Sequence, residues 1–211
     1  MKTVGQTDGV RPPVAENGLE PETHPFEPFL PADARLLMLG TFPPASKRWA
    51  MQFYYPNFTN DMWRIFGICF FGDKQHFVRQ QERTYDLDSI VAFLKAHRIA
   101  LFDTATRVIR TTGTASDKDL LVVEETNLRQ LLSCLPQCQA VVTAGQLATT
   151  IACRQFGVEE PKVMDYSVIT LSESPLRQLR LYRMPSSSRA YPLSVERKAE
   201  QYQKVFDYLK L

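Results

Sequence analysis

The amino-acid sequence predicts an α/β fold, a three-layer α/β/α sandwich around a central, mainly parallel sheet of about four strands. Short apolar runs of strand length alternate along the chain with segments of helical periodicity. The segments between these runs are long enough to hold a helix, which a crossover between parallel strands requires. With 211 residues, 44% of them hydrophobic, the chain can bury one good core.

Each predicted element has its own signal in the sequence. The strands are apolar runs that end in a turn or a loop, at residues 36–39, 99–102, 140–143, 168–171 and 179–184. Four helices are expected between and after these strands. Asp86 or Asp88 caps the first, and the second has an apolar face and ends at Pro136. The third spans residues 146–156 and ends at Gly157, and Ser194 caps the fourth.

The ends of the chain differ in composition. Residues 1–22 contain repeated glycine and proline, which predicts a flexible tail, and residues 23–211 are expected to form a single domain. The sequence contains no apolar leader and no run of membrane-spanning length, so we expect a cytoplasmic, monomeric protein without a membrane partner. Four cysteines suit buried thiols in a reducing compartment.

Several chemistries lack their signatures. The sequence has neither a dinucleotide fingerprint nor a phosphate-binding loop, and it has no G-x-S-x-G elbow. The three histidines lie far apart, and Cys134 and Cys138 have no second pair, so we expect no metal, no iron–sulfur cluster and no cofactor.

The charge distribution favours an anionic partner, although the net charge is only +2. Residues 177–198 carry six basic side chains against the single acid Glu196. A phosphate backbone would suit such a surface, and a solvated charged face explains it equally well.

Two segments carry the functional signal, and each follows a predicted buried strand. The first begins at Gly40 and includes a tyrosine pair, and the second contains three consecutive serines. Their residues are Gly40-Thr41-Phe42-Pro43-Pro44-Ala45-Ser46, continuing into Tyr54-Tyr55-Pro56-Asn57-Phe58-Thr59-Asn60-Asp61-Met62-Trp63, and Met184-Pro185-Ser186-Ser187-Ser188-Arg189. Since open parallel sheets bind ligands at the carboxyl ends of their strands, both segments are expected on one rim.

These segments resemble motifs of the uracil-DNA glycosylase superfamily, most closely those of its hypoxanthine-DNA glycosylase branch. The family patterns are G-S-F-P-x-x-x-S, Y-Y-x-H-P-x-N-x-F-W and P-S-T-S-P-A. Comparable segments surround His24-Pro25-Phe26, Asp103 and Ala144-Gly145-Gln146, so the resemblance spans roughly residues 24 to 208. It implies an enzyme of base-excision DNA repair, which hydrolyses the N-glycosidic bond of a deaminated base in DNA.

The resemblance also implies roles for individual residues. Asn60 occupies the place of the catalytic amide in the hypoxanthine-acting branch, and Phe42 stands where other branches have an acid or an amide. Asn60 is also well placed to cap the helical run that follows it, which is the alternative explanation. The residues expected to contact the substrate are Gly40, Thr41, Phe42, Pro43, Ser46, Tyr54, Tyr55, Asn57 and Trp63.

The second segment is expected to contact DNA and fill the gap left by the flipped base. Its residues are Pro185, Ser186, Ser187, Ser188, Arg189 and Tyr191, although an ordinary serine and proline turn has the same composition. The chain departs from the family pattern at Asn57, Phe58, Met62 and Arg189, which leaves Asn57 as the alternative catalytic amide. No lysine lies inside either motif, so we expect a glycosylase without lyase activity.

Two other classes of function stay open at this point. The chain could be a DNA-binding homologue with weak catalysis, since Phe42 can do no acid–base work. It could also be an α/β enzyme that acts on a small nucleoside-like substrate.

Overall fold

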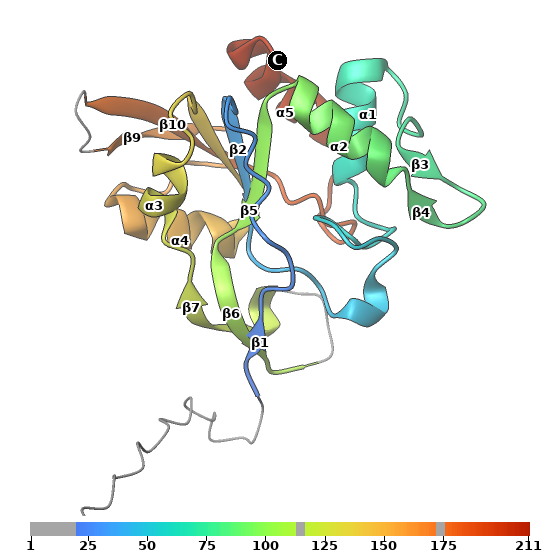
Figure 1. The fold of residues 1–211 in the computed structure, drawn as a ribbon, viewed down its shortest axis with the longest axis horizontal. Coiled ribbons are helices and arrows are strands. Elements are labelled where there is room, and N and C mark those ends of the chain that lie inside the picture. The colour runs from blue at the N-terminus through green and yellow to red at the C-terminus, as the bar shows by residue number, and fades with distance from the viewer. Residues whose placement is uncertain (1–19, 113–116, 172–175) are drawn as a thin grey trace, which may run out of the picture.

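A computed structural model describes residues 20–112, 117–171 and 176–211. Its main feature is a five-stranded sheet with strand order β5-β2-β8-β10-β9 (Figure 1). These strands are β2 (Leu36–Gly40), β5 (Ile99–Asp103), β8 (Ala140–Ala144), β9 (Tyr166–Leu171) and β10 (Arg177–Met184). Four of them run parallel, and β9 pairs antiparallel with β10 at the edge of the sheet. The predicted α/β class and the mainly parallel sheet are confirmed.

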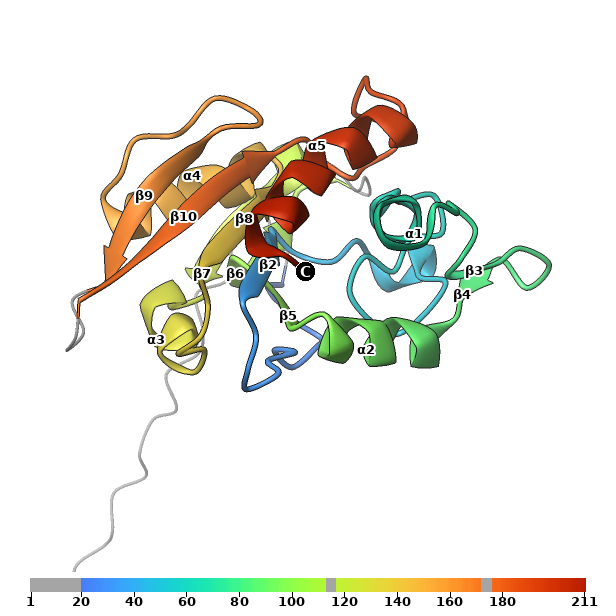
Figure 2. The same ribbon diagram turned by 90° about the horizontal axis from the view of Figure 1, so that it is seen from above.

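Helices cover both faces of this sheet. They are α1 (Met62–Phe71), α2 (Leu87–Ala96), α3 (Leu128–Ser133), α4 (Gln146–Phe156) and α5 (Val195–Leu209). Figures 1 and 2 show α1, α2 and α5 on one side of the sheet and α3 and α4 on the other. The predicted caps are present: Asp86 accepts a hydrogen bond from the Ser89 N–H, Ser194 accepts one from the Arg197 N–H, and Gly157 ends α4 with a positive φ.

A second, antiparallel sheet was not predicted. It contains β1 (Glu22–Thr23), β6 (Ala105–Arg110) and β7 (Leu120–Glu125), in the order β1-β6-β7. β6 follows β5 after a single residue, without a turn signal. β7 carries the apolar residues Leu121 and Val123 on its exposed face, so its sequence lacks the alternation of apolar and polar residues that predicts a half-buried strand.

The remaining elements are short. A hairpin is formed by β3 (Val78–Arg79) and β4 (Thr84–Tyr85), and 3-10 turns lie at Ser46–Arg48 and Asp117–Asp119. Most of the predicted tail, residues 1–19, lies outside the described residues, and the chain is already part of a sheet at Glu22.

The core lies between the main sheet and the helices. All residues of β2 and β5 are buried, and the aromatic ring of Phe66 on α1 stacks on Phe206 of α5 with centroids 5.5 Å apart. Burial raises the pKa of the Cys138 thiol to about 12, whereas Cys134 is exposed, contrary to the prediction of buried thiols. Among the described residues, no helix is long and apolar enough to cross a membrane.

Candidate active site

The two predicted motifs meet at the carboxyl edge of the main sheet. The backbone N–H of Asp61, just before α1, donates a hydrogen bond of 2.8 Å to the carbonyl oxygen of Ser187, just after β10. We call these two segments the 57–61 turn and the 185–189 loop. The parallel strand order brings them together, as the sequence predicts.

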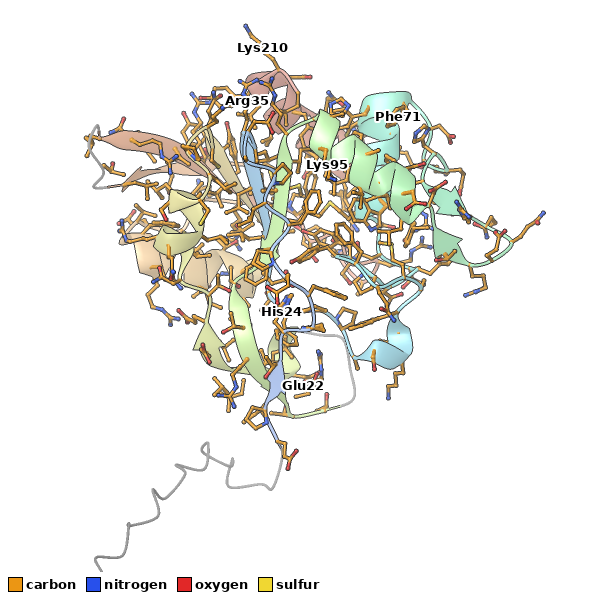
Figure 3. All side chains as sticks on the ribbon, viewed as in Figure 1. Glu22, His24, Arg35, Phe71, Lys95 and Lys210 are labelled. Atoms are coloured by element: carbon orange, nitrogen blue, oxygen red, sulfur yellow. The ribbon has the colours of Figure 1, made fainter. Side chains whose placement is uncertain are left out.

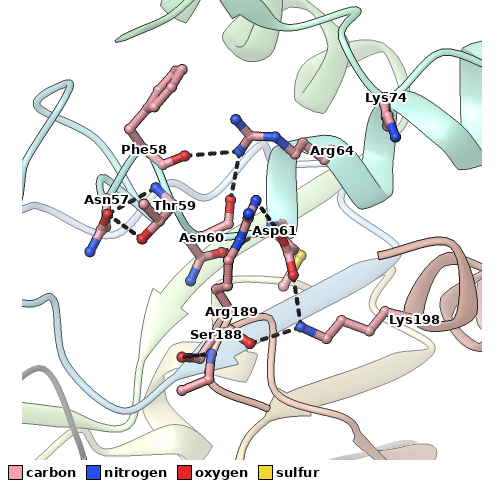
Figure 4. A network of polar contacts seen from close by, with 12 residues as sticks. Asn57, Phe58, Thr59, Asn60, Asp61, Arg64, Lys74, Ser188, Arg189 and Lys198 are labelled. Carbon is pink, nitrogen blue, oxygen red and sulfur yellow. Dashed lines mark hydrogen bonds and ion pairs between the residues drawn. The ribbon is translucent and has the colours of Figure 1, made fainter. Parts of the chain in front are cut away.

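A buried ion pair holds the turn and the loop in place. The Lys198 ammonium, on α5, is 0% exposed and lies 2.8 Å from Asp61 Oδ2. It also donates a hydrogen bond of 2.8 Å to the carbonyl oxygen of Ser188. Because a buried charge is costly unless it is paired and hydrogen-bonded, Lys198 ties both segments to α5 (Figure 4).

Asn60 lies at the start of α1 and uses only part of its amide there. Its Oδ1 accepts a hydrogen bond of 2.9 Å from the Met62 N–H, so the side chain caps the first N–H group of α1 from the position before the N-cap, which is Asp61. Among the described residues, no acceptor is hydrogen-bonded to its side-chain NH₂ group. The two explanations of Asn60 are therefore compatible, since the oxygen caps the helix and the NH₂ group is available to a ligand.

Asn57 uses its side chain within the turn itself. Its Oδ1 accepts hydrogen bonds from the backbone N–H and the hydroxyl of Thr59, both at 2.9 Å. The amide oxygen of Asn57 thus shapes the turn, while that of Asn60 supports the helix.

A carboxylate lies directly beside the Gly40 turn. Gly40 ends β2 opposite Asp103, which ends β5, and a Cβ atom on Gly40 would come within 2.4 Å of Asp103 Oδ1. Asp103 Oδ2 is hydrogen-bonded to His24 Nε2 at 2.9 Å, and both side chains are buried. Figure 3 shows His24 at the junction of the two sheets. Among the described residues, Oδ1 has no hydrogen-bond donor, so it faces the Gly40 turn unpaired.

Tyr55 adds a second unused polar atom at this edge. Its hydroxyl is buried and has no hydrogen-bond partner in the described part of the chain, and its backbone φ is +50°. Burial raises the pKa of this phenol, and the nearby Tyr202 and Asp103 add to the shift. Since buried hydroxyls are nearly always hydrogen-bonded, an unpartnered one at this edge of the sheet is unusual.

Tyr54 and Trp63 belong to the core rather than to an open surface. They are 2% and 0% exposed, and the Trp63 indole N–H donates a hydrogen bond of 3.1 Å to the Tyr54 carbonyl oxygen. Tyr54 donates its own hydroxyl to the Glu27 carbonyl oxygen at 2.7 Å. Tyr54 and Trp63 therefore stabilise the backbone around the site and do not offer a surface to a ligand.

The 185–189 loop is anchored by its backbone. Pro185 is buried and its carbonyl oxygen accepts a hydrogen bond of 2.9 Å from Tyr202. Ser187 is 3% exposed, whereas Ser188 and Arg189 are exposed. The Arg189 guanidinium lies 3.5 Å from Asp61 Oδ1, and Tyr191 is half-buried over Lys198. The exposed side chains of this loop can reach a partner.

Two hollows open beside parts of the predicted motifs. One, of about 300 Å³, is lined by Phe42, Pro43, Ser46, Trp49 and Arg110, among others. The other is a groove of about 620 Å³ beside Asp61 and Arg189. Thr41, the residue before Phe42, is buried, and its carbonyl oxygen accepts a hydrogen bond of 3.1 Å from the Ala105 N–H. Of the predicted site residues, Phe42, Pro43 and Ser46 line the first hollow and Arg189 lines the groove, and the others line neither.

The sequence analysis missed His24, Asp103 and Lys198 as site residues. Asp103 had a usable signal, because it ends a predicted apolar strand at the same edge as Gly40. Lys198 had one as well, because its spacing from Val195 and Tyr202 places it on the buried face of α5, where a lysine is rare unless it is paired. Within the described residues, no cluster of three or more histidine, cysteine, aspartate or glutamate side chains could hold a metal ion.

Comparison with known proteins supports the fold. A solution NMR structure from Methanosarcina acetivorans, named as a "putative Uracil DNA glycosylase", is similar to this chain with a TM-score of 0.58 and 22% sequence identity. The match covers 90% of this chain and 99% of that one. No family model and no curated protein matches the chain significantly. The chain therefore has the fold of that protein.

Proposed function

We propose that this protein is a DNA glycosylase that hydrolyses the N-glycosidic bond of a deaminated base, hypoxanthine or uracil, flipped out of DNA. The observation that carries the proposal is the hydrogen bond between Asp61 and Ser187, which joins the two motifs at one edge. The similarity of the whole fold to the Methanosarcina protein supports the same conclusion.

The base would bind between the Gly40 turn and Tyr55. Extruding a base from a duplex costs a few kcal/mol, and stacking on an aromatic ring returns about 1–3 kcal/mol per base. Phe42 and Tyr55 offer such rings at this edge. The buried Tyr55 hydroxyl and the unpaired Asp103 Oδ1 offer polar groups for the edge of the base.

Asp103 would select deaminated bases. Deamination replaces an amino group and a ring nitrogen acceptor by a carbonyl group and a ring N–H. A carboxylate accepts a hydrogen bond from that N–H, and it would face an acceptor in adenine or cytosine. A site built on such a hydrogen bond rejects the analogue that lacks it, because a buried polar group is then unpaired.

The reaction needs donors directed at the departing base. Water adds to C1′ of the sugar, the C1′–N bond breaks, and the base leaves with the bonding electrons and finally takes a proton from that water. Donors that face the negative charge on the base lower the barrier. We assign this role to the NH₂ group of Asn60, which has no acceptor among the described residues, while the side-chain oxygen accepts the Met62 N–H.

End-labelled oligonucleotides test this proposal. Single- and double-stranded DNA containing uracil, hypoxanthine, xanthine or an alkylated base would be treated with the protein and then with alkali, which cuts wherever a base is missing. We expect cleavage at uracil or hypoxanthine and none without alkali. If no strand is cut, the glycosylase assignment fails.

A DNA-binding homologue without catalysis is the second candidate. Phe42 favours it, because this apolar ring lies beside His24 with centroids 5.2 Å apart and can neither orient water nor transfer a proton. Such a protein would shift the mobility of the lesion-containing DNA without releasing base.

A further inference from the structure

The groove beside the 185–189 loop carries more positive charge than the proposed active site uses. The start of α1, the β3–β4 hairpin and the start of α5 form its walls. Four basic side chains line it against two acidic ones: Arg64, Lys74, Arg83 and Arg189 against Asp61 and Glu196. Lys198, which does not line the groove, already pairs with Asp61, so the positive charges of the lining outnumber the negative charges.

Arg64 is the most unusual member of this group. Its side chain is buried, with 7% of the residue exposed, and within the described part of the chain it forms no ion pair. A single nitrogen, Nη1, donates to the carbonyl oxygens of Phe58 and Asn60, at 2.9 and 3.0 Å, and to the Tyr85 hydroxyl at 2.9 Å. Nε and Nη2 have no acceptor among the described residues. A buried charge without a counter-ion is costly, so an anion in the groove would complete its environment.

Arg83 approaches the same place from the hairpin. Its guanidinium lies 5.5 Å from the ring centroid of Phe58, and the Arg64 guanidinium lies 5.1 Å from the same centroid. Among the described residues, Arg83 also has no carboxylate partner. The aromatic ring therefore holds two cations close together, by interactions that are weak enough to leave them available to an anion.

Arg189 completes the set from the opposite wall. Its ion pair with Asp61 is 3.5 Å long, and its side chain is 63% exposed, so the pair holds it only weakly. Figure 4 shows Arg64 and Arg189 reaching the 57–61 turn from two different elements, with Lys74 farther along.

We propose that this groove binds backbone phosphates of the DNA strand, which makes the β3–β4 hairpin part of the DNA interface. The choice of DNA as the source of the phosphates rests on the proposed function. The basic side chains come from α1, the segment between α1 and β3, the hairpin and the 185–189 loop, so four separate segments of the chain bring positive charge to one groove. Arginine and lysine contacts of this kind position a nucleic acid without reading its sequence.

The salt dependence of DNA binding tests this inference. The dissociation constant of an undamaged duplex oligonucleotide would be measured by fluorescence anisotropy over a series of salt concentrations. Each lost phosphate contact lowers the slope of log K against log salt by about 1. We expect Lys74→Gln/Arg83→Gln to bind more weakly at every salt concentration, with a slope smaller by about 2.

Arg79→Gln is the matched control, since Arg79 lies on the same hairpin, forms an ion pair with Asp86 at 3.0 Å and does not line the groove. This variant should bind like the parent. A double variant with the slope of the parent, or an equal loss in Arg79→Gln, would overturn the inference. A third result would also overturn the inference. In it, inorganic phosphate raises the thermal midpoint of the parent but not that of the double variant, while the two proteins bind DNA equally well.

Base release from lesion-containing DNA, measured on the same preparations, separates this inference from the proposed function. If the parent binds DNA through the groove but releases no base, the glycosylase proposal fails and the groove assignment stands. If the parent releases base and the groove variants keep the parental salt slope, only the groove assignment fails.

Discussion

The 57–61 turn and the 185–189 loop meet at one edge of the sheet and both accept anchoring hydrogen bonds on backbone carbonyl oxygens, but they leave different groups available to a ligand. In the turn, the side-chain oxygens of Asn57 and Asn60 accept backbone N–H groups, and the NH₂ group of Asn60 has no acceptor among the described residues. In the loop, backbone carbonyl oxygens receive the anchoring hydrogen bonds, and Ser188 and Arg189 are exposed. The proposed function gives the chemistry to the turn and the contact with DNA to the loop.

The largest effect is expected at Asn60. In Asn60→Asp the carboxylate can still accept the Met62 N–H, but it has no NH₂ group to donate to a departing base. Loss of one such donor typically lowers the rate by about 10²–10³. The rate of base release should fall by that factor, while the thermal midpoint stays near that of the parent.

Asn57→Ala decides between the two amides. Because the Asn57 oxygen serves Thr59 within the turn, we expect this variant to lose far less activity than Asn60→Asp. If the order of the two losses is reversed, Asn57 is the catalytic amide.

The next effect concerns the ion pair that joins the two segments. Lys198→Met leaves the buried Asp61 carboxylate with only the exposed Arg189 nearby, and breaking a buried pair in this way costs about 3–5 kcal/mol. Urea unfolding should show this loss in the free energy of unfolding. Lys204→Met, at an exposed position of the same helix, should stay within about 0.5 kcal/mol of the parent. Equal stability of Lys198→Met and the parent would mean that the pair does not hold the site together.

A smaller effect is expected at Arg189. Arg189→Ala removes an exposed side chain, so the free energy of unfolding should change by less than about 0.5 kcal/mol. Binding of duplex DNA should weaken several-fold, and the salt slope should fall by about 1. Unchanged DNA binding would remove the loop from the interface.

The smallest effect concerns pH at the start of α5. The backbone N–H of Glu196 and then Lys74 hold the pKa of the Glu196 carboxyl below its ordinary value of 4.5. Such a group stabilises the folded protein above pH 4.5, and its contribution is lost as the pH falls through the lower folded pKa. Glu196→Gln should therefore be less stable than the parent at pH 6, by under about 1 kcal/mol, and equal to it near pH 3. Unfolding curves at the two pH values measure this difference.

The sequence was most informative where apolar periodicity and caps agreed. The strands of the main sheet, the Ser194 cap and the Gly157 stop follow from local pattern. The second sheet did not, because β6 continues the chain after β5 without a turn and β7 exposes part of its apolar side. Residues such as His24, Asp103 and Lys198 find their partners across long stretches of chain, which no local pattern records.

Single-turnover kinetics on a hypoxanthine- or uracil-containing duplex test the central claim most directly, because they separate the bound-state rate from the affinity for DNA. At saturating protein, Asn60→Asp should lower the rate of base release by about 10²–10³ and keep the parental dissociation constant, whereas Arg189→Ala should raise the dissociation constant and keep the parental rate. If both variants change the same quantity, or if Asn60→Asp releases base as fast as the parent, the division of roles between the turn and the loop is wrong.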